Sequence, residues 1–424
     1  MNANPTPQSD PTSADLEVDA LLVGGGVAGL WLLNRLTSAG YRALLLERDG
    51  LGSGQTLASQ GMIHGGLKYA LSGRLTPAAT AIADMPARWA RCLAGEGEVD
   101  LRTVTVRTPD YHLFAASGTL GRLTTFFASR SLRGRMRRLR ATEFPDGLRT
   151  PAFKGVVYAL ADPVLDVPSL LTVLAQPVAD LIYRVDASTL FDPSTLTPDG
   201  ARLRLGGHQI HARRLILTAG AGTAGLLAAL GLGAPRMQRR PLHQVVVRAA
   251  GLPPLHAHCL TGIRRAEPRL TITSHPEGNE WLWYLGGQIA TAGVRQTRDE
   301  LIETARRELT ACFPWRTWRD ADIDTLAIDR AEPMQPDGAR PDQAFAVAAG
   351  PAGVCIVGWP VKLTLTPDLA DRVLSLLAPP AASLASGSRS NAARSGHDPR
   401  EPSALDLPRP VLAYEPWLRT PTHR

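Results

Sequence analysis

Residues 18–47, VDALLVGGGVAGLWLLNRLTSAGYRALLLE, decide the fold. The apolar run that ends in glycines at 18–26 is typical of a buried parallel strand. Residues 27–40 place apolar side chains at helical spacing and end at Gly40, a residue that favours helix termination. A second buried strand follows from residue 41. Strand, helix and strand at this spacing predict one βαβ unit.

A glycine motif lies at the turn between the first strand and the helix. Gly24, Gly26 and Gly29 satisfy the pattern G-x-G-x-x-G, and Glu47 stands at the end of the second strand. The first glycine permits the tight turn, the second lets backbone amides approach a pyrophosphate, and the third lets helix and strand pack closely. The helix N-terminus stabilises the phosphate charge, and Glu47 can accept hydrogen bonds from a ribose. The motif therefore predicts dinucleotide binding.

The acidic residue narrows the choice of dinucleotide. Glu47 would repel a 2′-phosphate, which disfavours NADP and leaves FAD and NAD. Two further glycine-rich segments, DGLGSG at 49–54 and SQGMIHGGLKY at 59–69, follow the second strand. A long cofactor that continues past the pyrophosphate toward a large ring would need such a backbone beside it.

At this point the sequence resembles a known family. Residues 21–69 are similar to the N-terminal part of the FAD-dependent oxidoreductases of the D-amino acid oxidase and glycine oxidase superfamily. The segment 59–69 resembles the corresponding loop of FAD-dependent glycerol-3-phosphate dehydrogenases and of L-2-hydroxyglutarate dehydrogenases. Residues 213–223 and 357–373 resemble the family's other flavin-contacting segments. The resemblance implies a Rossmann-like FAD-binding domain with a mostly parallel sheet, and a second α+β substrate domain on a mainly antiparallel sheet.

The resemblance also implies which residues bind FAD. Those at the ADP half would be Gly24, Gly26, Gly29 and Glu47, with Arg48 beside them and the Val185 backbone at the adenine. Those along the pyrophosphate and toward the isoalloxazine would be Gln55, Ser59, Gln60 and Gly61. Those that complete the flavin site would be Gly220, Lys362, Leu363 and Thr364.

Two residues of the loop at 59–69 are candidate catalytic residues. Reduced flavin carries negative charge near N1 and its C2 carbonyl, and a cation there would raise the flavin's electron affinity. His64 and Lys68 are the candidates for this role. A histidine bound to backbone in a tight loop, a solvated lysine, and covalent attachment of flavin to His64 remain as alternatives.

The substrate is less defined by the sequence. A substrate anion would be fixed by an arginine through a bidentate pair, and His275 and Tyr284 are candidates to line the pocket. The candidate arginines are Arg264, Arg265, Arg295 and Arg330. The glycerol-3-phosphate enzymes usually have arginine where Lys68 stands, and these 424 residues hold no counterpart of their long C-terminal helical domain, so their substrate does not transfer.

The sequence thus predicts an FAD-dependent oxidoreductase that moves a hydride from a small anionic substrate onto flavin N5. The substrate would be a 2-hydroxy acid or polyol phosphate, which the loop at 59–69 favours, or an amino acid or amine. Oxygen, a quinone or another acceptor would reoxidise the flavin. The alternatives are a non-catalytic dinucleotide-binding sensor or assembly protein, and an NAD-dependent dehydrogenase.

Length and composition predict two domains. The FAD-binding domain would comprise 16–92, 151–235 and 335–378, and the substrate domain 93–150 and 236–334. Residues 1–15 and 379–424, rich in Pro, Ser, Ala and Gly, would be disordered, although Tyr414 and Trp417 could dock onto the body or a partner.

Charge and cysteine content set the expected partners and compartment. The net charge is +7, with arginines concentrated at 129–140, and no aromatic residues interleave them, so we expect no nucleic acid partner. Four dispersed cysteines without a CxxC pair favour a reducing compartment and no metal site. The start is not a secretory signal. We expect a cytoplasmic protein, with peripheral contact to an anionic membrane face as an alternative.

The uncharged stretch 215–235 is long enough to span a bilayer, but its glycines divide it into a strand, a turn and a short helix.

Overall fold

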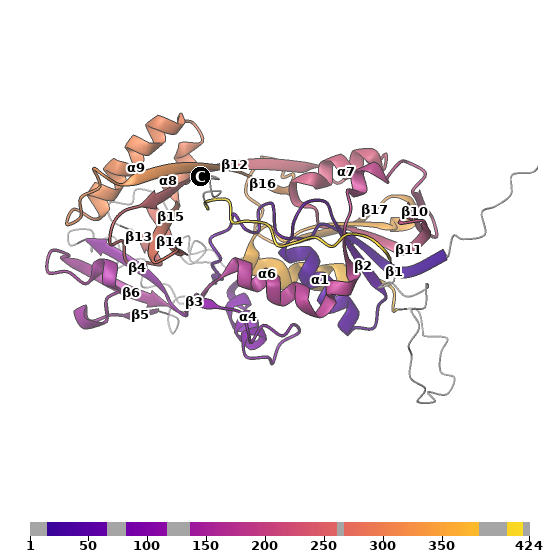
Figure 1. Ribbon diagram of the computed structural model, residues 1–424, viewed down its shortest axis with the longest axis horizontal. Helices are drawn as coiled ribbons and strands as arrows, with labels where there is room; N and C mark the ends of the chain where they lie inside the picture. The colour runs from indigo at the N-terminus through magenta and orange to yellow at the C-terminus, as the bar shows by residue number, and fades with distance from the viewer. Residues whose placement is uncertain (1–14, 66–81, 117–135, 261–266, 381–404, 419–424) are drawn as a thin grey trace, which may run out of the picture.

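A computed structural model of the protein describes residues 15–65, 82–116, 136–260, 267–380 and 405–418. Two lobes, each built on one sheet, lie side by side along the long axis of the molecule (Figure 1). The long strands β12 (Met237–Arg248) and β16 (Asp322–Pro333) extend from the second lobe over the first.

The βαβ unit predicted from residues 18–47 is confirmed. β1 (Asp15–Val23) and β2 (Ala43–Glu47) pair in parallel, and α1 (Val27–Ser38) connects them. The register joins Val23 to Leu46, so both strands end at the glycine motif. A ligand at the carboxyl edge of this sheet therefore meets the first turn of α1.

The first sheet is mostly parallel, as expected. Its order is β17-β18-β11-β1-β2-β8, and β9 and β10 join antiparallel beside β11. All neighbouring pairs along this order are parallel except β17·β18. The remaining strands are β8 (Ile182–Arg184), β9 (Leu196–Thr197), β10 (Gly200–Leu205), β11 (His208–Leu217), β17 (Phe345–Ala349) and β18 (Cys355–Trp359).

Helices cover both faces of this sheet. One face packs on α1, α4 (Met85–Leu93), α6 (Val167–Ala175) and α10 (Thr366–Leu374), and the other on α7 (Thr223–Ala229). Asp166 caps α6 by accepting a hydrogen bond from the Ser169 amide. The uncharged stretch 215–235 divides into the end of β11, a turn and α7. No helix among the described residues has both the length and the apolar composition needed to cross a membrane.

The second sheet is mainly antiparallel, with the order β16-β12-β15-β14-β13-β4-β6-β5 and one parallel pair, β13·β4. α8 (Gln288–Gly293) and α9 (Arg298–Cys312) pack against its outer face and bury Trp283. The other strands are β4 (Tyr111–Ala116), β5 (Met136–Arg138), β6 (Gly155–Leu160), β13 (Ala257–Cys259), β14 (Leu270–Glu277) and β15 (Glu280–Gly286). A separate pair joins β3 (Val106–Thr108) to β7 (Val164–Leu165).

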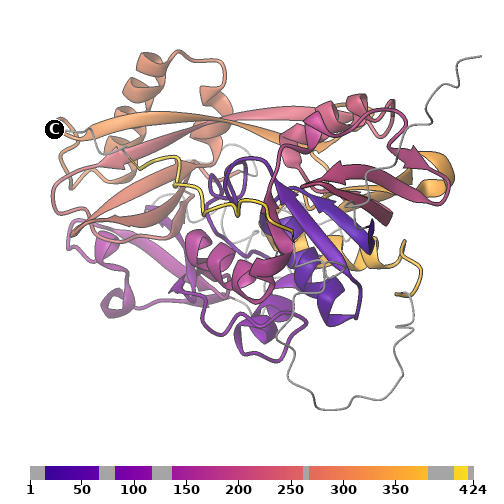
Figure 2. The ribbon, with the colours of Figure 1, turned by 45° about the vertical axis from the view of Figure 1, so that its right-hand side comes forward.

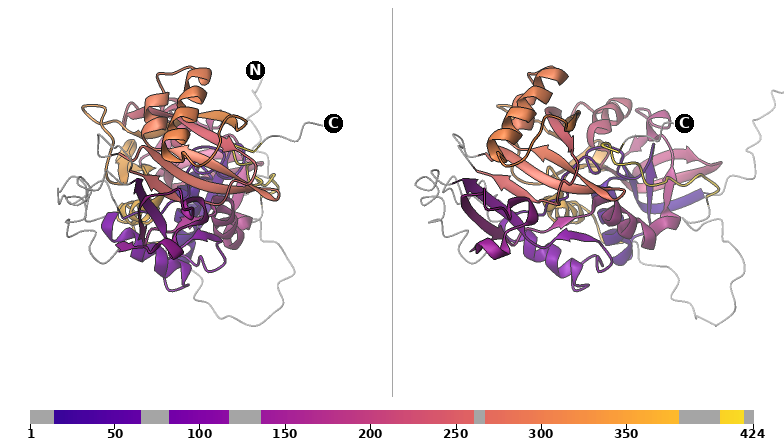
Figure 3. Two further views of the ribbon diagram at one scale, coloured as in Figure 1. Left: turned by 90° about the vertical axis from the view of Figure 1, so that its left-hand side faces the viewer. Right: turned by 60° about the vertical axis from the view of Figure 1, so that its left-hand side comes forward.

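Two features differ from the predicted domain organisation. β6 lies in the second sheet, although the boundary at residue 151 assigned it to the first domain. Residues 405–418, predicted within a disordered tail, form a C-terminal segment that runs across both lobes (Figures 1 and 2). Leu51 accepts from Ala413 and donates to Val411 at one end, and the Trp417 ring is 5% exposed at the other. Backbone pairing and one buried aromatic ring order this segment despite its low-complexity surroundings. The right-hand view of Figure 3 again shows this segment, in yellow, passing from one lobe to the other.

Candidate active site

The glycine motif forms a tight crossing of three segments. Gly24 has φ +112°, and a Cβ on it would lie 2.7 Å from the backbone of Thr218 and Ala219. A Cβ on Gly29 would lie 2.0 Å from the Gly24 carbonyl oxygen. These two glycines are therefore required by the protein's own backbone, as the motif predicts for its turn and packing positions.

Gly26 differs from these two glycines. Its backbone is extended, with φ −77°, and a Cβ would meet only Thr56 Oγ1, at 3.0 Å. As N-cap of α1 it brings no capping side chain to the first turn, where Thr56 Oγ1 accepts from the Val27 amide. The protein leaves room at this position, and the helix N-terminus directs positive charge there. Both properties fit the pyrophosphate of a dinucleotide.

Glu47 lies beside this turn as predicted. Its carboxylate accepts hydrogen bonds from the Gly25 amide at 2.5 Å and the Asp49 amide at 2.9 Å. The Val185 amide donates to the Glu47 carbonyl, so Val185 also lies at this edge of the sheet. Arg48 is mostly exposed and pairs with Asp49. The structure thus brings Glu47 and Val185 to the motif and directs Arg48 toward solvent.

In the second glycine-rich segment, residues 59–69, contacts within the protein account for Gly61 and for the position of the Gln60 side chain. A Cβ on Gly61, which has φ +68°, would lie 2.2 Å from the Leu165 carbonyl oxygen, so β7 requires this glycine whether or not a flavin ring is near. The Gln60 side chain enters the second lobe, where its amide donates to Thr271 and Tyr284 carbonyls at 3.1 Å. Gln60 therefore joins the lobes through its side chain.

One residue of the same segment has an unsatisfied polar atom. Ser59 Oγ is buried and has no hydrogen-bond partner within the described part of the chain. A buried hydroxyl without a partner is uncommon in native structures, because its desolvation is then uncompensated. Ser59 therefore fits a role as a hydrogen-bonding group for a cofactor.

Two predicted flavin segments, 61–65 and 362–364, meet at Thr364. Its hydroxyl accepts from the His64 amide at 3.1 Å, and its carbonyl accepts from the Trp89 indole at 3.0 Å. Lys362 lies 3.9 Å from Asp342 and its side chain is 6% exposed, while Leu363 opens the short helical turn before α10. Lys68 lies outside the described residues.

Val361, before Lys362, has φ +64°. A β-branched residue is strained in this conformation, and such strain occurs often at functional sites. The strained residue lies in the segment that the resemblance placed at the flavin.

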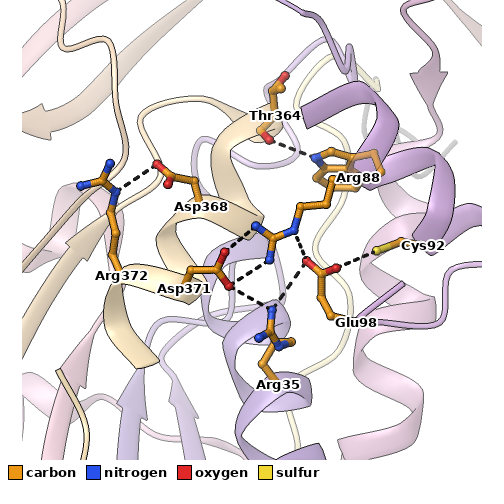
Figure 4. Close-up of polar contacts among 9 residues, drawn as sticks. Arg35, Arg88, Cys92, Glu98, Thr364, Asp368, Asp371 and Arg372 are labelled. Atoms are coloured by element: carbon orange, nitrogen blue, oxygen red, sulfur yellow. Dashed lines mark hydrogen bonds and ion pairs between the residues drawn. The ribbon is translucent and has the colours of Figure 1, made fainter. Parts of the chain in front are cut away.

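A charged network lies near Thr364 and fixes the position of α4 (Figure 4). Arg88 binds Asp371 through both terminal nitrogens, at 2.6 and 2.9 Å, and Glu98 at 2.6 Å. Arg35 of α1 lies 3.3 Å from Asp371 and 3.6 Å from Glu98. The network therefore ties α4 to α1 and α10, the two helices that follow the predicted cofactor-binding turns.

Gln55 and Gly220 are brought together at the end of β16. The Ala331 amide donates to Gln55 Oε1 at 2.9 Å, and a Cβ on Gly220 would lie 3.5 Å from the same oxygen. The Trp359 indole donates to the Gly220 carbonyl at 3.4 Å. The carboxyl ends of β11 and β18 and the second lobe thus converge here.

One face of the second sheet is turned toward the loop of the first lobe that contains Ala58 and Gln60. The register places Gln244, Tyr284 and Thr273 on this face, which we call the inner face. The Tyr284 hydroxyl donates to the Ala58 carbonyl at 3.0 Å and contacts Gln244, while Gln60 Nε2 reaches Thr273 Oγ1 at 3.4 Å. Tyr284 was predicted in the pocket, and His275 lies on the same face.

Arg330 lies on the inner face, opposite Arg240. Arg240 binds the fully buried Glu332 through two hydrogen bonds. Arg330 itself donates only to the Arg240 carbonyl, at 3.3 Å, and no carboxylate of the described residues lies within ion-pair distance of it. Burial, together with the nearby Arg240 and Arg340, lowers the pKa of Arg330.

The other predicted arginines do not share this environment. Arg295 is exposed directly after α8, and Arg264 and Arg265 lie outside the described residues. Sequence reasoning missed Thr56, which accepts from the Val27 amide at 3.2 Å, and Trp89. Neither belongs to a motif, and only their three-dimensional contacts show their positions.

Comparison with known proteins identifies the chemistry of this arrangement. The model of the family described as FAD dependent oxidoreductase (DAO) matches residues 19–358. A probable FAD-dependent oxidoreductase of Pseudomonas aeruginosa, PA4991, is 45% identical over 405 residues, which cover 95% of this chain and 98% of that protein. The crystal structure of PA4991 superposes with a TM-score of 0.75 at 39% identity, covering 96% and 99% of the two chains.

More distant structures share the fold. Glycine oxidase from Geobacillus kaustophilus has a TM-score of 0.58 at 20% identity, covering 85% of this chain and 94% of the oxidase. L-alpha-glycerophosphate oxidase from Mycoplasma pneumoniae, solved with FAD bound, has a TM-score of 0.60 at 14% identity and covers 85% and 94% of the two chains.

Proposed function

The chain belongs to the DAO family of FAD-dependent oxidoreductases, and on that premise we propose that it oxidises a small anionic substrate whose charged group is held by Arg330. The oxidised carbon would carry a hydroxyl or an amine next to that anion. FAD, when bound, supplies the hydride acceptor. The family's cofactor removes the NAD-dependent alternative.

The observation that carries this proposal is the environment of Arg330. Its guanidinium is partly buried on the inner face, next to Arg240, and has no carboxylate partner among the described residues. A half-buried cation beside two other arginines is costly, because Arg240 and Arg340 outweigh the more weakly acting Glu332 and Glu267, and an anionic ligand would relieve that cost. A planar guanidinium also matches a carboxylate or phosphate through two parallel hydrogen bonds.

The residues present fit FAD. The N-terminus of α1 at Gly26 and the Glu47 carboxylate would hold its pyrophosphate and ribose, and the Ser59 hydroxyl, which has no partner among the described residues, would contribute a further hydrogen bond. Tyr284 and Gln244 face these loops from the second sheet, where they would limit the size of a substrate and exclude water. The substrate is thus proposed to bind between the first lobe and the inner face.

Substitution of Arg330 tests the proposal. We expect Arg330→Ala to lower kcat/KM for the best anionic substrate about 100-fold, mainly through KM, because a charge-assisted bidentate contact is lost. Arg330→Lys should keep the charge and recover part of that loss. Steady-state kinetics on a panel of 2-hydroxy acids, polyol phosphates, amino acids and amines would also identify the reacting group, and oxygen uptake would test the acceptor.

Arg316→Ala is a matched control. Arg316 also lacks a carboxylate partner among the described residues, but it lies 5.9 Å from the Trp318 ring, in the cluster that packs on the outer face. Unchanged KM in Arg330→Ala, or an equal loss in Arg316→Ala, would contradict a role for Arg330 in binding the anion.

His64 is the catalytic candidate that the structure describes. Its amide donates to the Thr364 hydroxyl, which holds the backbone of residue 64 against the segment 362–364. We expect His64→Ala to lower turnover about 100-fold or to shift the flavin potential to a more negative value, because a hydrogen-bond donor or cation is removed. Turnover and a spectroelectrochemical titration that both match the unmodified protein would leave His64 with a structural role.

A further inference from the structure

Three segments bring together buried polar groups that lack hydrogen bonds. The atoms without a partner among the described residues are His275 Nδ1, Glu415 Oε1, Trp417 Nε1 and Arg107 Nε. His275, on β14, is 3% exposed, and its Nδ1 lies 3.8 Å from Glu415 Oε1. The Trp417 ring stacks against the His275 ring with centroids 4.4 Å apart. Glu415 and Trp417 both belong to the C-terminal segment.

Polar contacts link His275 to the loop at Gln60. Gln60 Nε2 lies 3.4 Å from Thr273 Oγ1, while its two hydrogens serve the Thr271 and Tyr284 carbonyls at 3.1 Å. The Thr273 hydroxyl forms a hydrogen bond with His275 Nε2 at 3.2 Å. On the other side of the ring, His275 Nδ1 lies 3.8 Å from Glu415 Oε1. A chain of packed polar groups therefore runs from Gln60 to Glu415.

Burial, with a smaller effect from nearby charges, keeps the His275 imidazole neutral. Burial lowers the pKa of His275 well below its usual value, and Arg107 and His256 lower it further. Burial raises the pKa of Glu415 to about 7; Asp166 also raises it, and Arg107 opposes the shift. Arg107 pairs with Asp166, so its charge is largely compensated. Glu415 is then the group of this cluster that titrates near neutral pH.

The two ends of the chain belong to segments that matter for the cofactor. Gln60 lies between Ser59 and Gly61 in the loop that follows the glycine motif. The C-terminal segment reaches the same motif from the other side, because Leu51 pairs with Val411 and Ala413 while the Gly52 amide donates to the Gly25 carbonyl. A change in the docking of the C-terminal segment can therefore affect the cofactor loop in two ways, through the polar chain to Gln60 and through the backbone pairing with Leu51.

We propose that Glu415 is a positioning residue for the FAD-binding loop 55–61, acting through His275 and Thr273 on Gln60, so that docking of the C-terminal segment and the geometry of the loop are coupled. This inference depends on the family's cofactor and is independent of the substrate proposed above. Glu415 touches neither of the predicted catalytic residues among the contacts of the described chain.

The coupling has a defined dependence on pH. When the segment undocks, Glu415 returns to its ordinary pKa near 4.5, whereas docked it titrates near 7. Docking is therefore most favourable when Glu415 is protonated, and it weakens as pH rises toward 7 and then levels off. Between pH 6 and pH 8 the docking equilibrium should fall about tenfold.

Hydrogen–deuterium exchange of the holoprotein tests the coupling, because it reports on both segments at once. We expect Glu415→Ala to raise exchange in peptides from 405–418 and also in peptides from 55–63, and to weaken FAD binding. Glu415→Gln retains an acceptor oxygen and should keep both segments protected. The matched control is Glu308→Gln, which removes the ion pair with Arg269 from α9, on the outer face, and should change neither segment.

The pH dependence is tested by the same hydrogen–deuterium exchange measurement, with each observed exchange rate divided by the intrinsic chemical exchange rate at that pH. Protection of 405–418 should fall about tenfold from pH 6 to pH 8 in the unmodified protein and remain constant in Glu415→Gln. Faster exchange confined to 405–418 in Glu415→Ala would mean that Glu415 only anchors its own segment, which would overturn the proposal. Equal pH dependence in Glu415→Gln would also overturn it, even if Glu415→Ala failed to fold.

Discussion

The Gly26→Val protein should fold and be colourless. Gly26 has an extended backbone that valine adopts readily, and its Cβ would meet only the Thr56 hydroxyl, which can move by a few tenths of an ångström. The added side chain would instead fill the space that the pyrophosphate approaches. We expect affinity for FAD to fall at least about 100-fold. Absorbance near 450 nm after purification and a fluorescence titration of the apoprotein with FAD would measure the loss.

Gly29→Ala is the informative comparison. Its Cβ would lie 2.0 Å from the Gly24 carbonyl oxygen, so α1 would have to move away from the turn. Overpacking of this kind should lower the free energy of unfolding by about 3 kcal/mol. Unfolding temperatures of the two apoproteins should therefore differ, with Gly26→Val near the unmodified protein. A yellow Gly26→Val protein with ordinary FAD affinity would contradict the assignment of this turn.

The βαβ unit could be predicted from sequence because residues close together along the chain determine it. Hydrophobic periodicity and the glycine spacing determine β1, α1 and β2 within a single stretch, and the position of Glu47 follows from them. The family resemblance added the segments at 213–223 and 357–373, and the structure brings both to the carboxyl edge of the first sheet.

Positions that depend on distant contacts could not be predicted in this way. Gly61 follows a pattern typical of a cofactor loop, yet the Leu165 carbonyl already requires it to be glycine. Gln60 is predicted along the pyrophosphate and toward the isoalloxazine, and the sequence gives no sign that its amide also satisfies two carbonyls of the second sheet. Residues 405–418 have a composition that favours disorder, but backbone pairing with Leu51 and burial of Trp417 order them. In each case a partner far away in sequence determines the outcome.

The second large effect is expected at Arg240. Its guanidinium donates two hydrogen bonds to Glu332, at 3.0 and 2.5 Å, and Glu332 is fully buried. Arg240→Met would leave that carboxylate without its ion pair, and removal of one partner from a buried pair costs about 3–5 kcal/mol. Chemical denaturation should show a loss of this size. Replacing both partners, in Arg240→Met/Glu332→Leu, should restore most of the stability, since no buried charge then remains.

The same pair of variants tests why Arg330 is available to a substrate. Glu332 lies close enough to Arg330 to raise its pKa, and in the unmodified protein Arg240 occupies the Glu332 carboxylate. In Arg240→Met that carboxylate is released next to Arg330 and would compete with an anionic substrate, so KM should rise. The double variant removes the competitor and should return KM toward its original value at similar kcat. A KM that stays high in the double variant would mean that Arg240 itself contacts the substrate, and the anion site would then consist of both arginines.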